Sequence, residues 1–268
     1  MKRLILFVLV LLIVGLSLFL YLRPRPVKET FSAMGTQFSI TVKSRNAKED
    51  ISAAKQRILA LEKLLNHFDK KSEIGRLNRG EKFNLSEDTR KCLALAEKAK
   101  QMTGGAFDVR YAGPLNLDGI GKGFAVEEAR RLLLKRRVKS AIIDCGSSIA
   151  VIGDKYRIGV KHPRKKDELL GIITLNPGEG LSTSGDYEQG RHIIDPRSKK
   201  PAAKCQAVTV VCEDAGLADG LSTGIFVMDP IKSVCLAQAL DIKVLIVSTD
   251  GKIYEHFGPQ LRLFVDKI

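Results

Sequence analysis

The sequence predicts an α+β protein, in which a compact mixed-sheet body follows one N-terminal transmembrane helix. Two observations carry this prediction: segments of helical period alternate with groups of strand-like segments, and a long uncharged run lies at the N-terminus. The composition, 44% hydrophobic and 28% charged, is globular and excludes a disordered or collagen-like chain. We therefore expect an anchor and spacer over residues 1–28 and one folded body over residues 29–268.

The N-terminal run extends from Leu4 to Leu22 without a charge. As a helix, its nineteen residues span roughly 28 Å, close to the hydrocarbon thickness of a bilayer. The run meets Arg23-Pro24-Arg25-Pro26 with neither an Ala-x-Ala site nor a Cys, so we expect an uncleaved signal-anchor rather than a cleaved signal. A buried core helix is the alternative, and uniform apolarity argues against it. Because a large domain behind such an anchor is usually exported, we expect the body on the outer, extracytoplasmic face of the cytoplasmic membrane.

The net charge of +14 is unevenly distributed. Five of the 44 Lys and Arg residues, and none of the 30 Asp and Glu residues, lie in the first 28 positions, so the body carries +9. A positive body suits an anionic substrate or an anionic membrane surface and selects neither. Aromatic residues make up only 6% and Trp is absent, so no stacking platform for nucleic acid is expected.

The first half of the body is expected to hold one strand and three helices. Apolar residues alternate along residues 30–42, as in a half-buried strand, and recur at helical spacing along residues 50–68. A second helix is expected to begin after Ser86, a good N-cap, and to end at the glycine pair 104–105. A third helix, over residues 123–139, follows a glycine-rich turn.

The second half alternates strands with two helices. Apolar and β-branched runs predict strands over residues 141–152, 156–161, 169–175 and 207–212, with Gly153-Asp154 as a hairpin turn. Helical spacing predicts helices over residues 215–228 and 230–240. A closing hairpin is expected from residues 244–248 and 252–256 around Asp250-Gly251.

The five cysteines show no CxxC pair and no spacing to His that suggests zinc. Each lies in an apolar or strand-like context, so buried thiols are expected, and one disulfide stays open. They are Cys92, Cys145, Cys205, Cys212 and Cys235.

Two clusters of residues suit an anionic ligand. From Asn116 to Phe124, three glycines and Lys122 lead into a helix, where backbone N–H groups and a positive helix end suit a phosphate. This segment is not a Walker loop, and a plain tight turn is the alternative. Residues 181–186 place hydroxyls beside a glycine, which suits an anion or a flat ring; the alternative is a polar turn between strands.

Two further clusters suit proton transfer and metal binding. His192, in residues 191–196, can exchange protons at neutral pH, although a surface histidine is the alternative. Asp219 and Thr223 are four residues apart on an expected helix, so they point to one face. Their oxygens are of the kind that Mg²⁺ prefers, with substrate phosphate completing the shell. The alternative is an ordinary solvated helix face.

In this order the clusters resemble the ApbE family, the FAD:protein FMN transferases. The resemblance runs from about residue 31 to residue 265, and its fold is the ApbE-like (T-fold-related) type of α+β body. It rests on seven motifs in family order: MGT at 34–36, SEIGRLN at 72–78, GGAFDV at 104–109, GIGKGFAV at 119–126, STSGDY at 182–187, HIIDP at 192–196 and ADGLST at 218–223.

The resemblance implies an activity that depends on Mg²⁺. The family cleaves FAD, attaches FMN through a phosphoester bond to a Thr or Ser of an acceptor protein, and releases AMP. The implied FAD contacts are Met34, Phe68, Ala106, Phe107, Asp108, Asn116, Lys122 and Ile194. The implied metal site is Gly119 through its carbonyl, Asp219 and Thr223, with Ser222 nearby, and the implied base is His192. The implied acceptor is a redox subunit, such as one of a Na⁺-translocating NADH:quinone reductase or an Rnf-type complex.

The sequence departs from the family pattern at three places: Asn116 followed by Asp118, Gly146-Ser147-Ser148, and a short loop at residues 110–115. The short loop motivates an alternative function, hydrolysis of FAD to FMN and AMP or FAD binding without transfer. A third alternative is a non-enzymatic basic domain that binds acidic lipid or nucleic acid.

Overall fold

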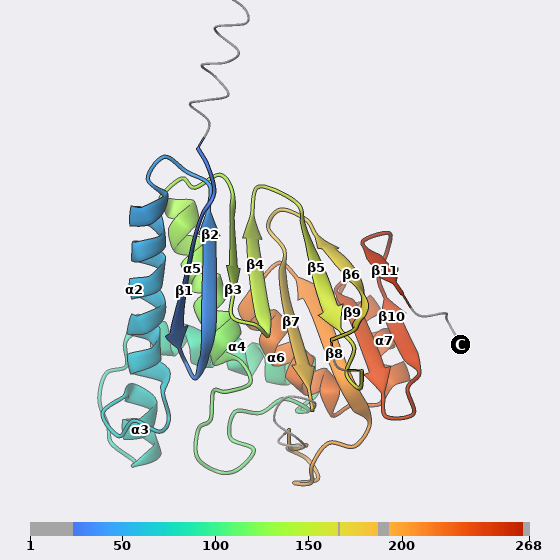
Figure 1. The fold of residues 1–268 in the computed structure, drawn as a ribbon. Helices are drawn as coiled ribbons and strands as arrows, with labels where there is room; N and C mark the ends of the chain where they lie inside the picture. The colour runs from blue at the N-terminus through green and yellow to red at the C-terminus, as the bar shows by residue number, and fades with distance from the viewer. Residues whose placement is uncertain (1–23, 166, 187–192, 265–268) are drawn as a thin grey trace, which may run out of the picture.

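The computed structural model describes residues 24–165, 167–186 and 193–264. They form three layers: helices, a large sheet and a small sheet (Figure 1). The large sheet has eight strands in the order β1-β2-β3-β4-β7-β8-β9-β10, and the small sheet has three in the order β11-β6-β5. The α+β architecture is therefore confirmed. The strand pairs are antiparallel throughout, so the expectation of a mixed sheet is wrong.

The first two strands form a hairpin, β1 (Val27–Ala33) and β2 (Thr36–Val42), where one strand was expected. The turn residues Met34 and Gly35 have φ values of 50° and 71°. Two successive positive φ values belong to the tight turns that match the twist of paired strands. Apolar residues alternate along both arms, so hydropathy alone does not reveal the turn.

Four helices follow: α2 (Ala47–Leu65), α3 (Glu73–Asn78), α4 (Glu87–Met102) and, after a long connection, α5 (Gly121–Lys135). Helices α2 and α5 pack against strands of the large sheet, whereas α3 packs against α2, and α4 against α6 and α2 (Figure 1). The prediction for α4 is confirmed, and the Ser86 hydroxyl accepts from the backbone N–H of Thr89 at 3.2 Å. Helix α5 ends four residues before the expected position, because Arg137 has a φ of 62°. A left-handed residue cannot continue a right-handed helix.

The expected single strand at residues 141–152 is also two strands, β3 (Ala141–Asp144) and β4 (Ser148–Ile152). Gly146, with a φ of 87°, lies in the turn between them. The hairpin expected at Gly153-Asp154 is wrong as well. The next strand, β5 (Tyr156–Lys161), leaves the large sheet and pairs with β6 (Leu169–Leu175) in the small one.

The remaining elements largely follow the prediction: β7 (Gly180–Gly185), β8 (Cys205–Cys212), α6 (Ala215–Phe226), α7 (Pro230–Ala239), β9 (Lys243–Ser248), β10 (Ile253–His256) and β11 (Leu261–Leu263). The hairpin of β9 and β10 is confirmed. Residues 181–186 lie in and directly after strand β7, so their interpretation as a polar turn between strands is wrong.

Apolar residues pack on both faces of the large sheet. On the helix side, Phe38, Phe124 and Phe226 are among the largest side chains that are almost fully buried. On the other side, Val151 and Val211 pack against the small sheet through residues such as Leu175. Within the described ranges, no helix has the length and apolarity needed to cross a bilayer. The predicted anchor, residues 4–22, lies outside the described residues.

Candidate active site

The centre of the site is a buried carboxylate on α6. Asp219 is 4% exposed, and in the described part of the chain it takes part in no ion pair. Its Oδ2 accepts from the backbone N–H of Gly123 at 2.9 Å, and its Oδ1 accepts from the hydroxyl of Ser182 at 2.9 Å. Neutral donors alone do not offset the cost of burying a charge. The carboxylate is therefore suited to receive a cation.

Further oxygens surround Asp219. Thr223 lies one turn along α6, with its Oγ1 3.1 Å from Ser184 Oγ on β7 and 3.4 Å from the carbonyl oxygen of Gly119. Ser222 Oγ lies 2.9 Å from Ser184 Oγ and donates to the backbone carbonyl of Asp219 at 3.0 Å. The structure thus brings together all four residues of the predicted metal site. We call the following set the oxygen cluster: Asp219, Thr223, Ser222, Ser182, Ser184 and the carbonyl of Gly119.

The donor types of the oxygen cluster fit Mg²⁺. Carboxylate, hydroxyl and carbonyl oxygens are hard ligands, and protein-bound Mg²⁺ usually keeps waters or substrate oxygens in its remaining positions. No group of three or more His, Cys, Asp or Glu residues within the described ranges is arranged to hold a metal ion. The cluster therefore lacks the donors of a zinc site, and a single carboxylate leaves room for phosphate oxygens.

Glycines allow this geometry because they let α5 approach α6 closely. A Cβ on Gly123 would lie 2.4 Å from the carbonyl oxygen of Ala215 and 2.5 Å from Asp219 Cβ. Real Cβ atoms do not come so close, so a side chain at this position would force the helices apart. Only glycine lets the N–H of residue 123 reach the carboxylate of Asp219.

A hollow of about 290 Å³ opens beside the same segment. Lys122 is the only Lys or Arg among its described lining residues, and its Nζ donates to the Asp118 carbonyl at 2.9 Å. Phe68 is 80% exposed at the rim, with its ring centroid 3.8 Å from that of His67. An exposed aromatic ring and an ammonium group suit a ligand with a flat ring and phosphates. The lining residues are Met34, Gly35, Glu62, Leu65, Asn66, His67, Phe68, Leu117, Asp118, Gly121 and Lys122.

The glycine-rich segment connects the hollow to the oxygen cluster. Gly121 and Lys122 line the hollow, whereas Gly119 and Gly123 contact Thr223 and Asp219. This segment also forms the N-terminal end of α5, where the helix dipole favours negative charge. A ligand in the hollow that extends a phosphate along this segment would reach the oxygen cluster.

Three of the eight predicted FAD contacts, Met34, Phe68 and Lys122, line the hollow. Two others, Ala106 and Phe107, are 1% and 4% exposed. The ring of Phe107 lies behind the glycine-rich segment, 3.2 Å from where a Cβ on Gly119 would be. The contacts of Ala106 and Phe107 with FAD stay predictions.

The other predicted site residues either contact other residues of this chain or lie outside the residues that the structure describes. Asp108 pairs with Lys100 at 2.9 Å, and Asn116 Oδ1 accepts from the backbone N–H of Asp118 at 2.8 Å. Ile194 forms an isolated bridge with Pro201. His192, the predicted base, lies outside the described residues, and its role stays a prediction.

Several residues of the hollow are not among the predicted site residues. Glu62 Oε1 accepts from the backbone N–H of Met34 at 2.6 Å and so fixes the hairpin turn against α2. His67 Nδ1 lies 3.6 Å from Asp118 Oδ1. Glu62 lies in the last turn of α2, and Asn66, four residues on, is its C-cap. No local signal shows that this end of α2 meets the turn of a distant hairpin.

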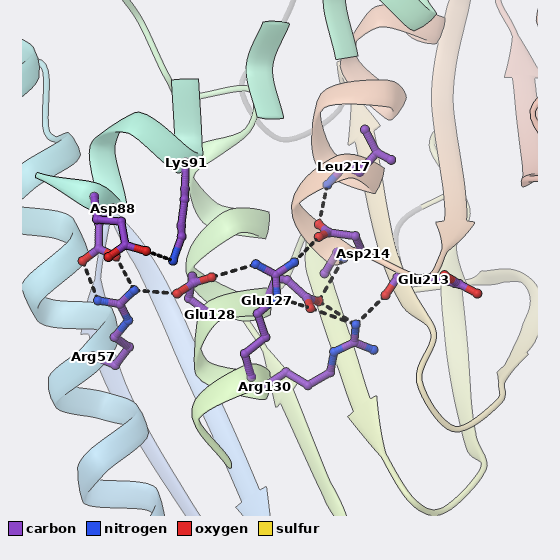
Figure 2. A network of polar contacts seen from close by, with 12 residues as sticks. Arg57, Asp88, Lys91, Glu127, Glu128, Arg130, Glu213, Asp214 and Leu217 are labelled. Carbon is purple, nitrogen blue, oxygen red and sulfur yellow. Dashed lines mark hydrogen bonds and ion pairs between the residues drawn. The ribbon is translucent and has the colours of Figure 1, made fainter. Parts of the chain in front are cut away.

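A second polar group, centred on α5, contrasts with the oxygen cluster (Figure 2). Arg57 on α2 pairs with Asp88 on α4 at 2.6 Å and with Glu128 on α5 at 2.5 Å. Arg131 bridges Glu128 at 2.8 Å and Asp214 at 2.7 Å. We call this the ion-pair network; its members are Arg57, Asp88, Glu127, Glu128, Arg130, Arg131 and Asp214.

The ion-pair network holds the start of α6. Asp214 caps this helix by accepting from the backbone N–H of Leu217 at 2.9 Å, and Glu127 accepts from that of Ala215 at 3.3 Å. Burial raises the pKa of Glu127, an effect that Arg130 opposes. Hydrogen bonds from Arg57 hold the pKa of Asp88 below its ordinary value. The network thus positions the helix that carries Asp219.

The cysteines supply no nucleophile for this site. All five thiols are free, and Cys92, Cys145 and Cys205 are buried as expected. Burial raises the pKa of Cys145 to about 11 and that of Cys205 to about 12, so both stay protonated at neutral pH. Cys212 on β8 is only partly buried, and the expectation of a buried thiol is wrong for Cys235, which is exposed on α7.

Comparisons with known proteins agree with this geometry. The sequence profile of the ApbE family matches residues 34–114 and 111–246. An FAD:protein FMN transferase of Rhodobacter capsulatus is 28% identical in an alignment 194 positions long, which covers 66% of this chain and 36% of that protein. One of Haemophilus influenzae is 26% identical in a gapped alignment 286 positions long, which covers 80% of this chain and 82% of that protein. This chain thus spans little more than a third of the Rhodobacter relative and most of the Haemophilus one.

A solved structure shares the fold. The ApbE protein of Thermotoga maritima superposes with a TM-score of 0.79 at 26% identity, covering 86% of this chain and 96% of that one. The fold is therefore that of an ApbE-like α+β protein. Because the family profile covers most of the sequence, the chain belongs to the ApbE family.

Proposed function

We propose that this protein is an FAD:protein FMN transferase that depends on Mg²⁺. The observation that carries the proposal is the unpaired, buried carboxylate of Asp219 in a cluster of hydroxyl and carbonyl oxygens, joined by the glycine-rich segment to a hollow with an exposed aromatic ring. Transfer of a phosphoryl group needs its charge neutralised and its phosphorus held in line with the attacking oxygen. Membership of the ApbE family and the names of its relatives support the same activity.

In this proposal the hollow binds and orients FAD. Phe68 offers a face for a flat ring, and the ammonium of Lys122 adds positive potential for the pyrophosphate. The N-terminal end of α5 contributes in the same sense. These groups place the pyrophosphate along the glycine-rich segment, toward the oxygen cluster.

Asp219, Thr223 and the carbonyl of Gly119 would hold Mg²⁺, which when bound neutralises pyrophosphate oxygens and stabilises negative charge on the departing AMP. Ser182 and Gly123 fix the carboxylate of Asp219 through hydrogen bonds, so that its oxygens are oriented before substrate arrives. Ser184, on strand β7, positions the hydroxyl of Thr223 on α6.

The nucleophile belongs to the acceptor protein. Its Thr or Ser oxygen attacks the phosphorus on the FMN side, the new P–O bond forms, and the P–O bond to AMP breaks with its electron pair leaving on AMP. We assign His192 as the base that takes the proton of the acceptor hydroxyl. The acceptor is an exported or membrane-bound redox subunit, and the N-terminal run attaches the enzyme to the same membrane.

The test uses the full chain in detergent with FAD, Mg²⁺ and a purified redox subunit that carries a Thr acceptor. Transfer yields a fluorescent flavin band that survives a denaturing gel. We expect strong labelling by the wild type, loss in Thr223→Val and retention in Thr223→Ser. Thr183→Val serves as the matched control, because the Thr183 hydroxyl pairs with that of Thr209 at 2.9 Å, away from the oxygen cluster.

The same reactions, assayed for AMP, separate the two enzymatic functions. A transferase releases AMP in step with labelling and depends on the acceptor hydroxyl, so a Thr→Ala acceptor stops both. Release of AMP at the same rate without an acceptor would establish an FAD pyrophosphatase and contradict the proposal. Full labelling by both His192→Ala and Asp219→Ala would show that the site is assigned wrongly even if transfer occurs.

A further inference from the structure

One end of the body gathers exposed cations, and we call it the basic end. It lies where β2 leads into α2 and where α5 leads into β3, two junctions that the pairing of Val42 with Ala141 holds together. Within the described ranges, none of its six defining cations forms an ion pair. They are Lys43, Arg45, Lys48, Lys135, Arg137 and Lys139, all exposed.

Few acidic groups offset this charge. Asp50 is buried beneath the basic end and is occupied by Arg136 Nε at 2.7 Å and Ser44 Oγ at 2.6 Å. Glu49 and Asp154 are exposed nearby. A hollow of about 310 Å³ at this end has Arg45, Arg136 and Arg137 in its wall. The surface therefore combines unpaired positive charge with a recess, which suits clustered anionic groups.

The polypeptide enters the body at this same end. Strand β1 begins at Val27, which pairs with Val42, the residue before Lys43 (Figure 1). Only four residues separate Leu22, the end of the uncharged run, from Val27. Even fully extended, the five steps from Leu22 to Val27 reach only about 18 Å. With the run in a bilayer, the basic end must stay close to the lipid headgroups.

We infer that the basic end docks on anionic lipid headgroups and holds the body in one orientation on the membrane. This inference rests on the membrane attachment proposed above and does not depend on the proposed reaction. Screening at physiological salt acts over about 8 Å, so cations this close to a charged surface are attracted to it. Strand β1 runs from the basic end to the Met34 turn at the hollow, about 20 Å away. The candidate active site therefore faces away from the bilayer.

Leu134 provides a reporter for this contact. It lies in the last turn of α5 at the basic end and is 50% exposed. The chain contains no Trp, so a Leu134→Trp variant has one indole signal. Ile231, 64% exposed at the start of α7, lies toward the other end of the body and provides the matched Ile231→Trp control.

The experiment reconstitutes the full chain into vesicles of phosphatidylcholine, with or without phosphatidylglycerol, that contain a headgroup-nitroxide lipid as quencher. Flotation first establishes attachment. We expect phosphatidylglycerol to shift the ratio of docked to undocked bodies on the order of tenfold, seen as stronger quenching of Leu134→Trp and reversed by high salt. Ile231→Trp should stay unquenched in both lipids.

Two charge-reversal triples complete the test. Reversal of Arg45, Arg137 and Lys139 to Glu should abolish the increase with phosphatidylglycerol. Reversal of Lys82, Lys98 and Lys232, which are exposed elsewhere, should leave it unchanged. If the protein floats but Leu134→Trp is quenched equally with and without phosphatidylglycerol, the inference is overturned. It is also overturned if both triple variants lose the increase in quenching to the same extent. Failure to float would overturn the attachment and the inference with it, whereas flavin transfer measured in detergent would report separately on the proposed function.

Discussion

The oxygen cluster and the ion-pair network meet at α6 and differ in how they hold buried charge. In the network, Glu127 and Glu128 each pair with two arginines. In the cluster, Asp219 is buried to a similar degree but receives only neutral donors. Paired charges hold elements in place, whereas an unpaired buried carboxylate costs stability and persists where function needs it. The presence or absence of ion pairs thus distinguishes residues that hold the fold from those of the candidate active site, without reference to any related protein.

The substitution Asp219→Asn should have the largest effect. We expect flavin transfer to fall about a thousandfold, or about 4 kcal/mol of transition-state stabilisation, since the charge that would hold the metal is lost. The free energy of unfolding should change by less than about 1 kcal/mol, because no ion pair breaks. Transfer rates and urea unfolding measure the two quantities. A stability loss larger than the loss in transfer would make Asp219 a scaffold residue.

The substitution Gly123→Ala should damage both regions, because α5 carries one and touches the other. The added Cβ meets Ala215 and Asp219 within 2.5 Å, so the free energy of unfolding should fall by about 3 kcal/mol. Transfer should fall more than tenfold in protein that remains folded, as measured by labelling at low temperature. Gly258→Ala is the control: it has no atom within 4 Å of the new Cβ and should change stability by less than about 0.5 kcal/mol.

The substitution Glu128→Gln should affect the scaffold alone. It leaves Arg57 and Arg131 without a shared carboxylate, and partial solvent exposure of both arginines limits the loss of unfolding free energy to about 2 kcal/mol. Transfer per folded molecule should stay within about twofold of wild type, because no contact of the oxygen cluster changes. Glu87→Gln, in an exposed pair with Lys91, should leave the free energy of unfolding close to that of the wild type, because solvent screens this pair. Thermal unfolding of the two variants, measured side by side, tests whether Glu128→Gln loses more stability than Glu87→Gln.

The smallest effect concerns pH. Hydrogen bonds from Arg57 lower the pKa of Asp88 below its ordinary 3.8, so the unfolded chain binds this proton more readily than the folded one. The stabilisation is complete above about pH 5 and is lost as the pH falls through the lowered pKa. Asp88→Asn should remove about 1 kcal/mol at neutral pH and flatten the acid limb of a plot of unfolding free energy against pH. Parallel plots for wild type and variant would refute this assignment.

Local signals explain which elements could be predicted from the sequence. Helix α4 has its N-cap at Ser86 and glycines directly after its end, and the β9–β10 hairpin has Asp250-Gly251 at its turn. The strands of each merged pair could not be separated by hydropathy, because apolar residues lie on both sides of each turn. What divides them is positive φ at Met34 and Gly146, a backbone property that hydropathy does not report.

The candidate site likewise has one part that could be predicted from the sequence and one part that could not. Asp219 and Thr223 could be paired from sequence because they lie one turn apart on one helix. The contact of Ser182 with Asp219 joins residues 37 apart and depends on how α6 lies across β7. Likewise, the hollow depends on α2 meeting the turn of the first hairpin. Packing between distant elements sets these contacts, so spacing along the chain does not disclose them.

The most direct test of the contrast is metal binding itself. Mn²⁺, a paramagnetic substitute for Mg²⁺, can be titrated into the full chain with FAD and its free concentration followed by electron paramagnetic resonance. The oxygen cluster should give one site that Asp219→Asn removes and that Glu128→Gln, in the ion-pair network, leaves intact. Equal Mn²⁺ binding by wild type and Asp219→Asn, or loss in Glu128→Gln alone, would contradict the central claim that the unpaired carboxylate marks the active site.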